Sequence, residues 1–146
     1  ILLFVLLLLV PRSPGNTDLA TTSDNTGVVD DEVQKALRMV EGEQPMQGIL
    51  KLRSILEEDP QNIDAAWNLG RFSIETGQFE NAVSRLEQVL ENKGEEKYPD
   101  TFIYLGHANE QLGNVVEAKK NYERFLESES EPQLMEEVRK RIAGLE

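Results

Sequence analysis

The chain has 146 residues, with 15 Lys and Arg against 27 Asp and Glu, a formal net charge of −12, and no cysteine. This length suits one domain of ordinary size. The composition excludes a disulfide-stapled mini-protein, a cysteine-ligated metal site and, for lack of a basic excess, a general nucleic-acid binder.

Residues 1–10 contain no polar side chain. As a helix they would rise about 15 Å, half the thickness of a bilayer core. We expect a truncated transmembrane anchor or, alternatively, the apolar core of a secretory signal segment. No small-residue cleavage pattern follows, which favours the anchor. The sequence therefore predicts attachment to a membrane, with the domain on the periplasmic side of a bacterial membrane and the orientation left open.

Residues 11–30 are dominated by Pro, Gly, Ser, Thr, Asn and Asp. Such a stretch cannot bury enough apolar surface to offset the entropy lost on ordering. We therefore expect a disordered linker between the apolar segment and a folded domain over residues 31–146.

The sequence after residue 30 repeats itself. Leu69-Gly70 recurs as Leu105-Gly106 at an offset of 36 residues, and Leu86 matches Leu52 at an offset of 34. An internal repeat of this length is typical of stacked helical units. Three copies follow one another, at about residues 31–60, 61–94 and 97–130.

Each copy is predicted to contain two helices. In the middle copy, apolar residues at three-and-four spacing predict one helix over 63–76 and a second over 79–92. Gly77 ends the first of these, since glycine takes the left-handed conformation without a Cβ penalty. After the third copy, Pro132 opens a helix at 132–145 with one apolar side, which is expected of a capping helix.

These residues resemble the tetratricopeptide-repeat family, whose 34-residue unit carries a W-x2-L-G-x2-Y…A-x3-F…P pattern. The middle copy has Leu69-Gly70 and then Ala82-x3-Leu86, and the third has Leu105-Gly106 and then Ala118-x3-Tyr122. The resemblance implies an all-α fold: a right-handed superhelix of stacked helix–turn–helix units with a C-terminal capping helix. It also implies that the first helix of each unit lines a concave groove, which holds a peptide or an extended segment of a partner protein.

The family's groove positions, transferred residue by residue, predict the partner-binding residues. They are Gln34, Arg38 and Glu41 in the first copy, Trp67, Asn68, Arg71 and Glu75 in the second, and Asp100, Ile103, His107, Glu110 and Gln111 in the third. Two interpretations of Trp67 have equal weight: it anchors a peptide in the groove, or it is a core residue between neighbouring helices.

No combination of residues indicates catalysis, a metal site or a cofactor. His107 is the single histidine and has no cysteine or second histidine as a partner for a metal. The sequence contains no glycine-rich phosphate-binding motif, and we interpret its runs of acidic residues as solvent-exposed charge.

We therefore expect a non-enzymatic adaptor or scaffold that binds a protein or peptide, with no small-molecule substrate and no nucleic acid. The alternative is an accessory or regulatory subunit of a larger membrane complex, for example a cytochrome-maturation-like assembly factor, that stacks through its repeat ends. The net charge would steer basic partners at long range, and the groove would select among them by local pairing.

Overall fold

A computed structural model describes residues 26–129 and 131–145, and their side chains from Asp31 onward. Within these residues the chain forms seven helices and no strand, which confirms the predicted all-α fold. The helices are α2 (Thr26–Glu41), α3 (Pro45–Glu58), α4 (Ile63–Glu75), α5 (Phe79–Glu91), α6 (Thr101–Gln111), α7 (Val115–Ser128) and α8 (Pro132–Ala143).

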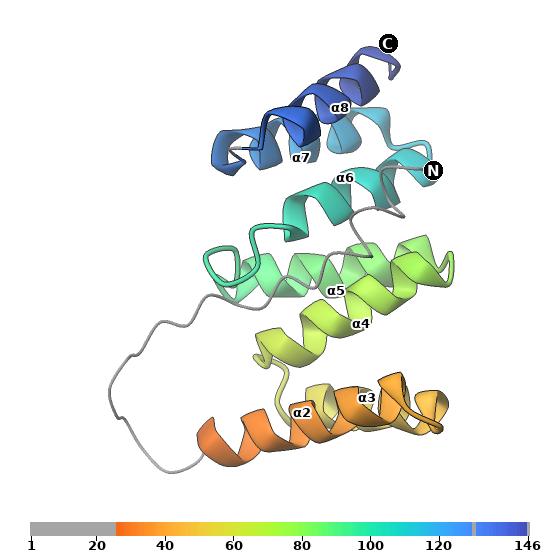
Figure 1. Ribbon diagram of the computed structural model, residues 1–146, viewed down its shortest axis with the longest axis vertical. Coiled ribbons are helices and arrows are strands. Elements are labelled where there is room, and N and C mark those ends of the chain that lie inside the picture. The colour runs from red at the N-terminus through yellow and green to blue at the C-terminus, as the bar shows by residue number, and fades with distance from the viewer. Residues whose placement is uncertain (1–25, 130, 146) are drawn as a thin grey trace.

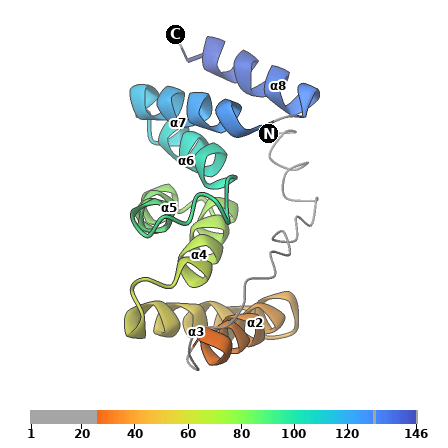
Figure 2. The ribbon, with the colours of Figure 1, turned by 90° about the vertical axis from the view of Figure 1, so that its left-hand side faces the viewer.

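The helices stack in pairs along the long axis of the molecule. α2 packs against α3, α4 against α5, and α6 against α7, and each pair also contacts the next one through α3·α4 and α5·α6. Figures 1 and 2 show the pairs in sequence order, from α2 and α3 at one end to α8 at the other. The packing is that of stacked helical repeats.

The helix ends follow from local chemistry. Gly77 and Gly113 take φ values of +72° and +77° just after α4 and α6, a conformation that costs glycine nothing. The Asn62 side chain accepts a hydrogen bond from the backbone N–H of Ala65 at 2.9 Å and so caps α4. α6 begins at Thr101, so Pro99 lies before the helix rather than in its first turn.

The apolar residues form a column of three clusters rather than one centre. The first joins α2, α3 and α4 with Val89 of α5, the second joins α4, α5 and α6, and the third joins α6, α7 and α8. The repeated small and large positions supply them: Ala82, Leu86, Ala118 and Tyr122 are all fully buried. The first helices α4 and α6 are each shared by two clusters, which is why they need apolar residues on two sides.

Of residues 1–30, for which we expected a membrane segment and a linker, only residues 26–30 lie within the described part of the chain. α2 begins at Thr26, five residues inside the segment 11–30 that we expected to be a linker. Residues 1–10, the expected membrane segment, and residues 11–25 lie outside the described residues.

The expected membrane-anchored, periplasmic location is wrong on the structural finding. In the part of the chain that the structure describes, no helix has both the length and the apolar character needed to cross a bilayer.

Candidate functional site

Trp67, in the middle of α4, is the aromatic centre of the predicted site. Its indole stacks on the ring of Tyr98 with 4.4 Å between ring centroids, and Tyr104 of α6 meets it edge-on at 6.3 Å. The side chain packs against two core clusters and remains partly exposed. Its indole nitrogen is buried without a hydrogen-bond partner among the described residues, so the exposed part is ring carbon. Trp67 thus contributes to both core and surface.

Arg71 lies one helical turn further along α4. Its guanidinium carbon is 5.3 Å from the centroid of the Trp67 ring and 5.1 Å from that of Phe72, which places the cation over two aromatic faces. Its Nε lies 4.0 Å from Oε1 of Glu75, an exposed residue at the end of α4. The two charges therefore stand beside the aromatic centre, within reach of solvent.

The loop between α5 and α6 folds back onto α4. The Lys97 ammonium lies 2.7 Å from one carboxylate oxygen of Asp64, and the Tyr98 hydroxyl donates to the same oxygen at 2.6 Å. This attachment places Tyr98 over Trp67. The family positions did not include Asp64, Lys97 or Tyr98. The available signal was the two extra residues in this loop, which lengthen the repeat from 34 to 36 residues.

Two of the predicted groove residues are buried. Asn68 is 5 % exposed, and its side-chain amide donates to the Asp64 backbone carbonyl at 2.8 Å. Ile103 is 1 % exposed and packs in the third cluster with residues of α7 and α8. Because α8 closes over this side of α6, Ile103 has a structural role here. Neither side chain offers accessible surface to a partner.

His107 and Glu110 join α6 to its neighbours. The His107 ring meets Phe79 of α5 edge-on at 5.7 Å. Burial, reinforced by the positive charge of Arg141, lowers the pKa of His107 to about 4, so the imidazole is neutral at physiological pH. Glu110 accepts a hydrogen bond from the Tyr122 hydroxyl at 2.6 Å and lies 3.5 Å from Nε of Arg141 on α8. Burial is the larger cause that raises the pKa of Tyr122, and the hydrogen bond to Glu110 raises it further.

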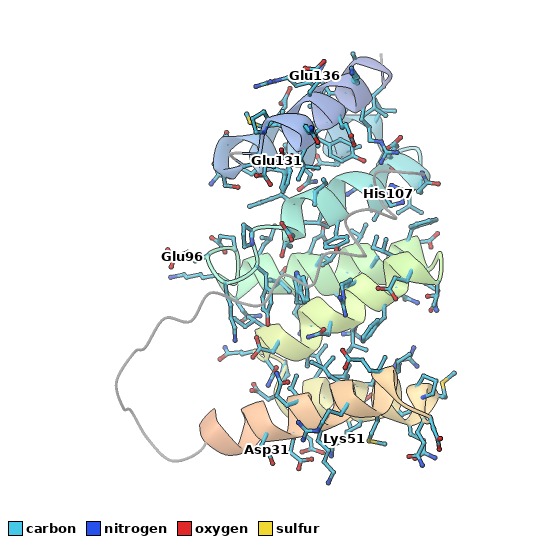
Figure 3. All side chains as sticks on the ribbon, viewed as in Figure 1. Asp31, Lys51, Glu96, His107, Glu131 and Glu136 are labelled. Carbon is cyan, nitrogen blue, oxygen red and sulfur yellow. The ribbon has the colours of Figure 1, made fainter. Side chains whose placement is uncertain are left out.

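The remaining predicted residues are more exposed and lie further apart. Gln34, Arg38 and Glu41 are exposed on α2, and Gln111 is exposed at the end of α6. Asp100 is half-buried just before α6. Figure 3 places His107 and Glu96, a residue of the α5–α6 loop, at opposite edges of the stack. Of the predicted residues on α4, Trp67 contacts α6 directly, through Tyr104.

The side chains around Trp67 offer groups that can bind another molecule. Within the described residues, no three His, Cys, Asp or Glu side chains are grouped so that they could hold a metal ion. The polar groups near Trp67 are engaged in ion pairs and hydrogen bonds with one another. Such a surface can recognise another molecule by stacking, charge pairing and hydrogen bonding.

Residues 43–98 match a family model described as tetratricopeptide repeat. The match covers α3, α4, α5 and the loop after α5, including Trp67, Arg71 and Tyr98. No curated protein matches the chain. The match supports the resemblance that the repeated residues indicate, and a tetratricopeptide region indicates a protein–protein interaction module.

Proposed function

We propose that this chain is a non-enzymatic interaction module that binds an extended segment of a partner protein along α4 and α6. The α4/α6 surface is here defined by the accessible members of the predicted set: Trp67, Arg71, Glu75, His107 and Gln111. The resemblance to tetratricopeptide repeats implies that the first helices face the concave side, where these residues would meet a partner.

The single observation that carries the proposal is the position of Arg71 over the partly exposed ring of Trp67. Trp and Arg are the residue types that most often dominate binding energy at protein interfaces, particularly when surrounding residues restrict water. Tyr98 and Tyr104 pack around the indole and hold it in place. A preorganised aromatic side chain loses little conformational entropy when a partner binds.

The proposal is tested by site-directed crosslinking. A photoreactive amino acid, p-benzoylphenylalanine, placed at the exposed positions 75 and 111 of the full chain should capture a partner protein in cells. The same amino acid at the exposed position 137 on α8 is the matched control. Capture at 75 and 111 but not at 137 supports the proposal. Equal capture at all three positions, or at none, contradicts it.

Binding strength provides a second measurement on the captured partner. Arg71→Ala removes the cation over the indole while leaving Trp67 in place, and we expect affinity to fall about tenfold, as for a typical interface anchor. Glu137→Ala on α8 should leave affinity unchanged. Equal affinities for the Arg71→Ala variant and the parent chain would exclude this surface as the binding site.

The alternative of an accessory subunit that stacks through its repeat ends gains no specific support. This alternative predicts large exposed apolar side chains on the last helix, α8. In the part of the chain that the structure describes, such side chains lie on α3 and α7: Met46, Leu50, Val115 and Val116.

A further inference from the structure

A second surface lies between the second helices of the first two pairs. It is a cleft of about 470 Å³ lined by residues of α3, α4 and α5, and it shares no lining residue with the α4/α6 surface. Its apolar lining includes Ile49, Leu69 and Phe72, with Met46 at 66 % exposure. We call it the α3/α5 cleft. Its volume falls in the range that encloses one or two large side chains of a ligand.

The charge of the α3/α5 cleft is opposite to that of the chain. Arg53 and Arg85 line it together with one acid, Glu57, in a protein of net charge −12. Arg53 is exposed and forms no ion pair with any described residue, and Arg85 donates only to the amide oxygen of Gln88, at 3.4 Å. Two guanidinium groups beside an apolar cleft are therefore available to carboxylates.

The equivalent cleft of the next repeat provides an internal comparison. It has about 380 Å³ and is lined by residues of α5, α6 and α7. Four of its lining residues are acidic: Glu87, Glu117, Glu123 and Glu127. Its two cations are occupied, because Lys120 pairs with Glu117 at 3.5 Å and Arg124 pairs with Glu127. The two equivalent clefts thus differ: the arginines of the α3/α5 cleft form no ion pair with a described residue, whereas both cations of the second cleft do.

We propose that the α3/α5 cleft is a second docking site, which takes an acidic segment of a partner protein carrying one or two apolar anchor residues. The anchors contact Phe72 and Ile49, and flanking Asp or Glu side chains pair with Arg53 and Arg85. Leu50, which is 52 % exposed one turn along α3 from Met46, extends the apolar rim. The negative charge of the whole chain does not prevent this pairing, because physiological salt screens charges beyond about 8 Å.

The test is a selection of peptides against the full chain. A display library of random 16-residue peptides is panned on the parent chain and counter-selected on the Arg53→Glu/Arg85→Gln variant. We expect peptides that bind only the parent to combine Asp or Glu with Leu, Met or Phe. Selection of basic peptides, or of none that distinguishes parent from variant, overturns the proposal.

The selected peptide is then measured by fluorescence anisotropy. Its affinity should fall at least tenfold with Arg53→Glu alone, an exposed substitution that keeps the assay valid if the double variant does not fold. The charge-matched control Lys120→Glu, in the other cleft, should leave affinity unchanged, and so should Gln111→Ala on the α4/α6 surface, a residue that does not line the α3/α5 cleft. Loss of binding with Gln111→Ala would assign the peptide to the α4/α6 surface and overturn the second site.

Amide chemical shifts and sedimentation complete the test. Shifts in the labelled parent chain should cluster on α3, α4 and α5 when the peptide is added. Self-association of the full chain that disappears with Arg53→Glu would identify a second copy of the chain as the occupant, and it would overturn the assignment to an acidic partner.

Discussion

Gly48 allows the first helical pair to approach closely, and substituting it should separate that pair. A Cβ atom at this position would lie 2.5 Å from the carbonyl oxygen of Ala36 and 2.7 Å from the backbone nitrogen of Val40, both on α2. Ordinary contact begins near 3.4 Å. Because both neighbours are backbone atoms, no side-chain rotation relieves the clash, and α2 must move by roughly 0.9 Å.

The size of the effect follows from two opposing contributions. Overpacking in a close-packed region costs about 1–3 kcal/mol, and occasionally more. Alanine is better than glycine in a helix by about 1 kcal/mol. We expect Gly48→Ala to lower the free energy of unfolding by about 1–2 kcal/mol, in the upper half of the difference because the clash is with backbone atoms. Loosened packing of α2 would also expose the buried residues Val33, Ala36 and Leu52 of the first cluster.

The measurement is urea unfolding of the full chain at 25 °C, followed by far-UV circular dichroism, together with hydrogen exchange of the α2 amides. Gly144→Ala is the matched control, because a Cβ there lies 3.5 Å from its nearest neighbour and φ is −78°. That variant should be unchanged or up to about 1 kcal/mol more stable. The reasoning is refuted if Gly48→Ala is as stable as the parent chain, or if Gly144→Ala loses as much.

Three further predictions concern the polar contacts. His107→Gln should remove part of the pH dependence of the free energy of unfolding, because the histidine takes up its proton near pH 6.5 in the unfolded chain but only near pH 4 in the folded one. Between pH 7 and 4.5 the parent should therefore lose about 1–2 kcal/mol of stability relative to the variant, after allowance for the partial exposure of the ring. Urea unfolding of both chains at the two pH values measures the difference. Tyr122→Phe removes the donor to Glu110 and should lower the free energy of unfolding by about 1–2 kcal/mol; an equally stable variant would show that this bond contributes nothing. Asp64→Asn should change global stability by less than about 1 kcal/mol but increase amide exchange around Tyr98; unchanged exchange would mean that the loop does not depend on Asp64.

The sequence repeat predicts the helices because each helical pair must place small and large residues at equivalent positions in order to pack. Leu86 and Tyr122 sit 36 residues apart, and both are fully buried against the glycine of the preceding helix, Gly70 or Gly106. Small and large residues must alternate across each pair, so this part of the fold could be predicted from local pattern alone.

The binding surface is less predictable because its residues depend on non-local packing. The family positions selected Ile103, yet α8 covers it; they also selected Asn68, whose amide is used within α4. They missed Tyr98, which lies over Trp67 only because the α5–α6 loop turns back through Lys93 at φ 57° and is held by Asp64. Helical periodicity carries no information about a loop of this kind.

The same distinction between repeated and unrepeated residues bears on function. An offset of 34 or 36 residues leaves the core positions alike but changes the surface: Arg53 corresponds to Glu87 and Arg85 to Asn121. Along the first helices, Arg71 corresponds to His107 and Glu75 to Gln111. A surface that repeated its chemistry would accept a segment in several registers, whereas one that changes at every step favours a single register and direction. Residues that break the repeat are therefore the ones to substitute when binding is to be altered and the fold retained.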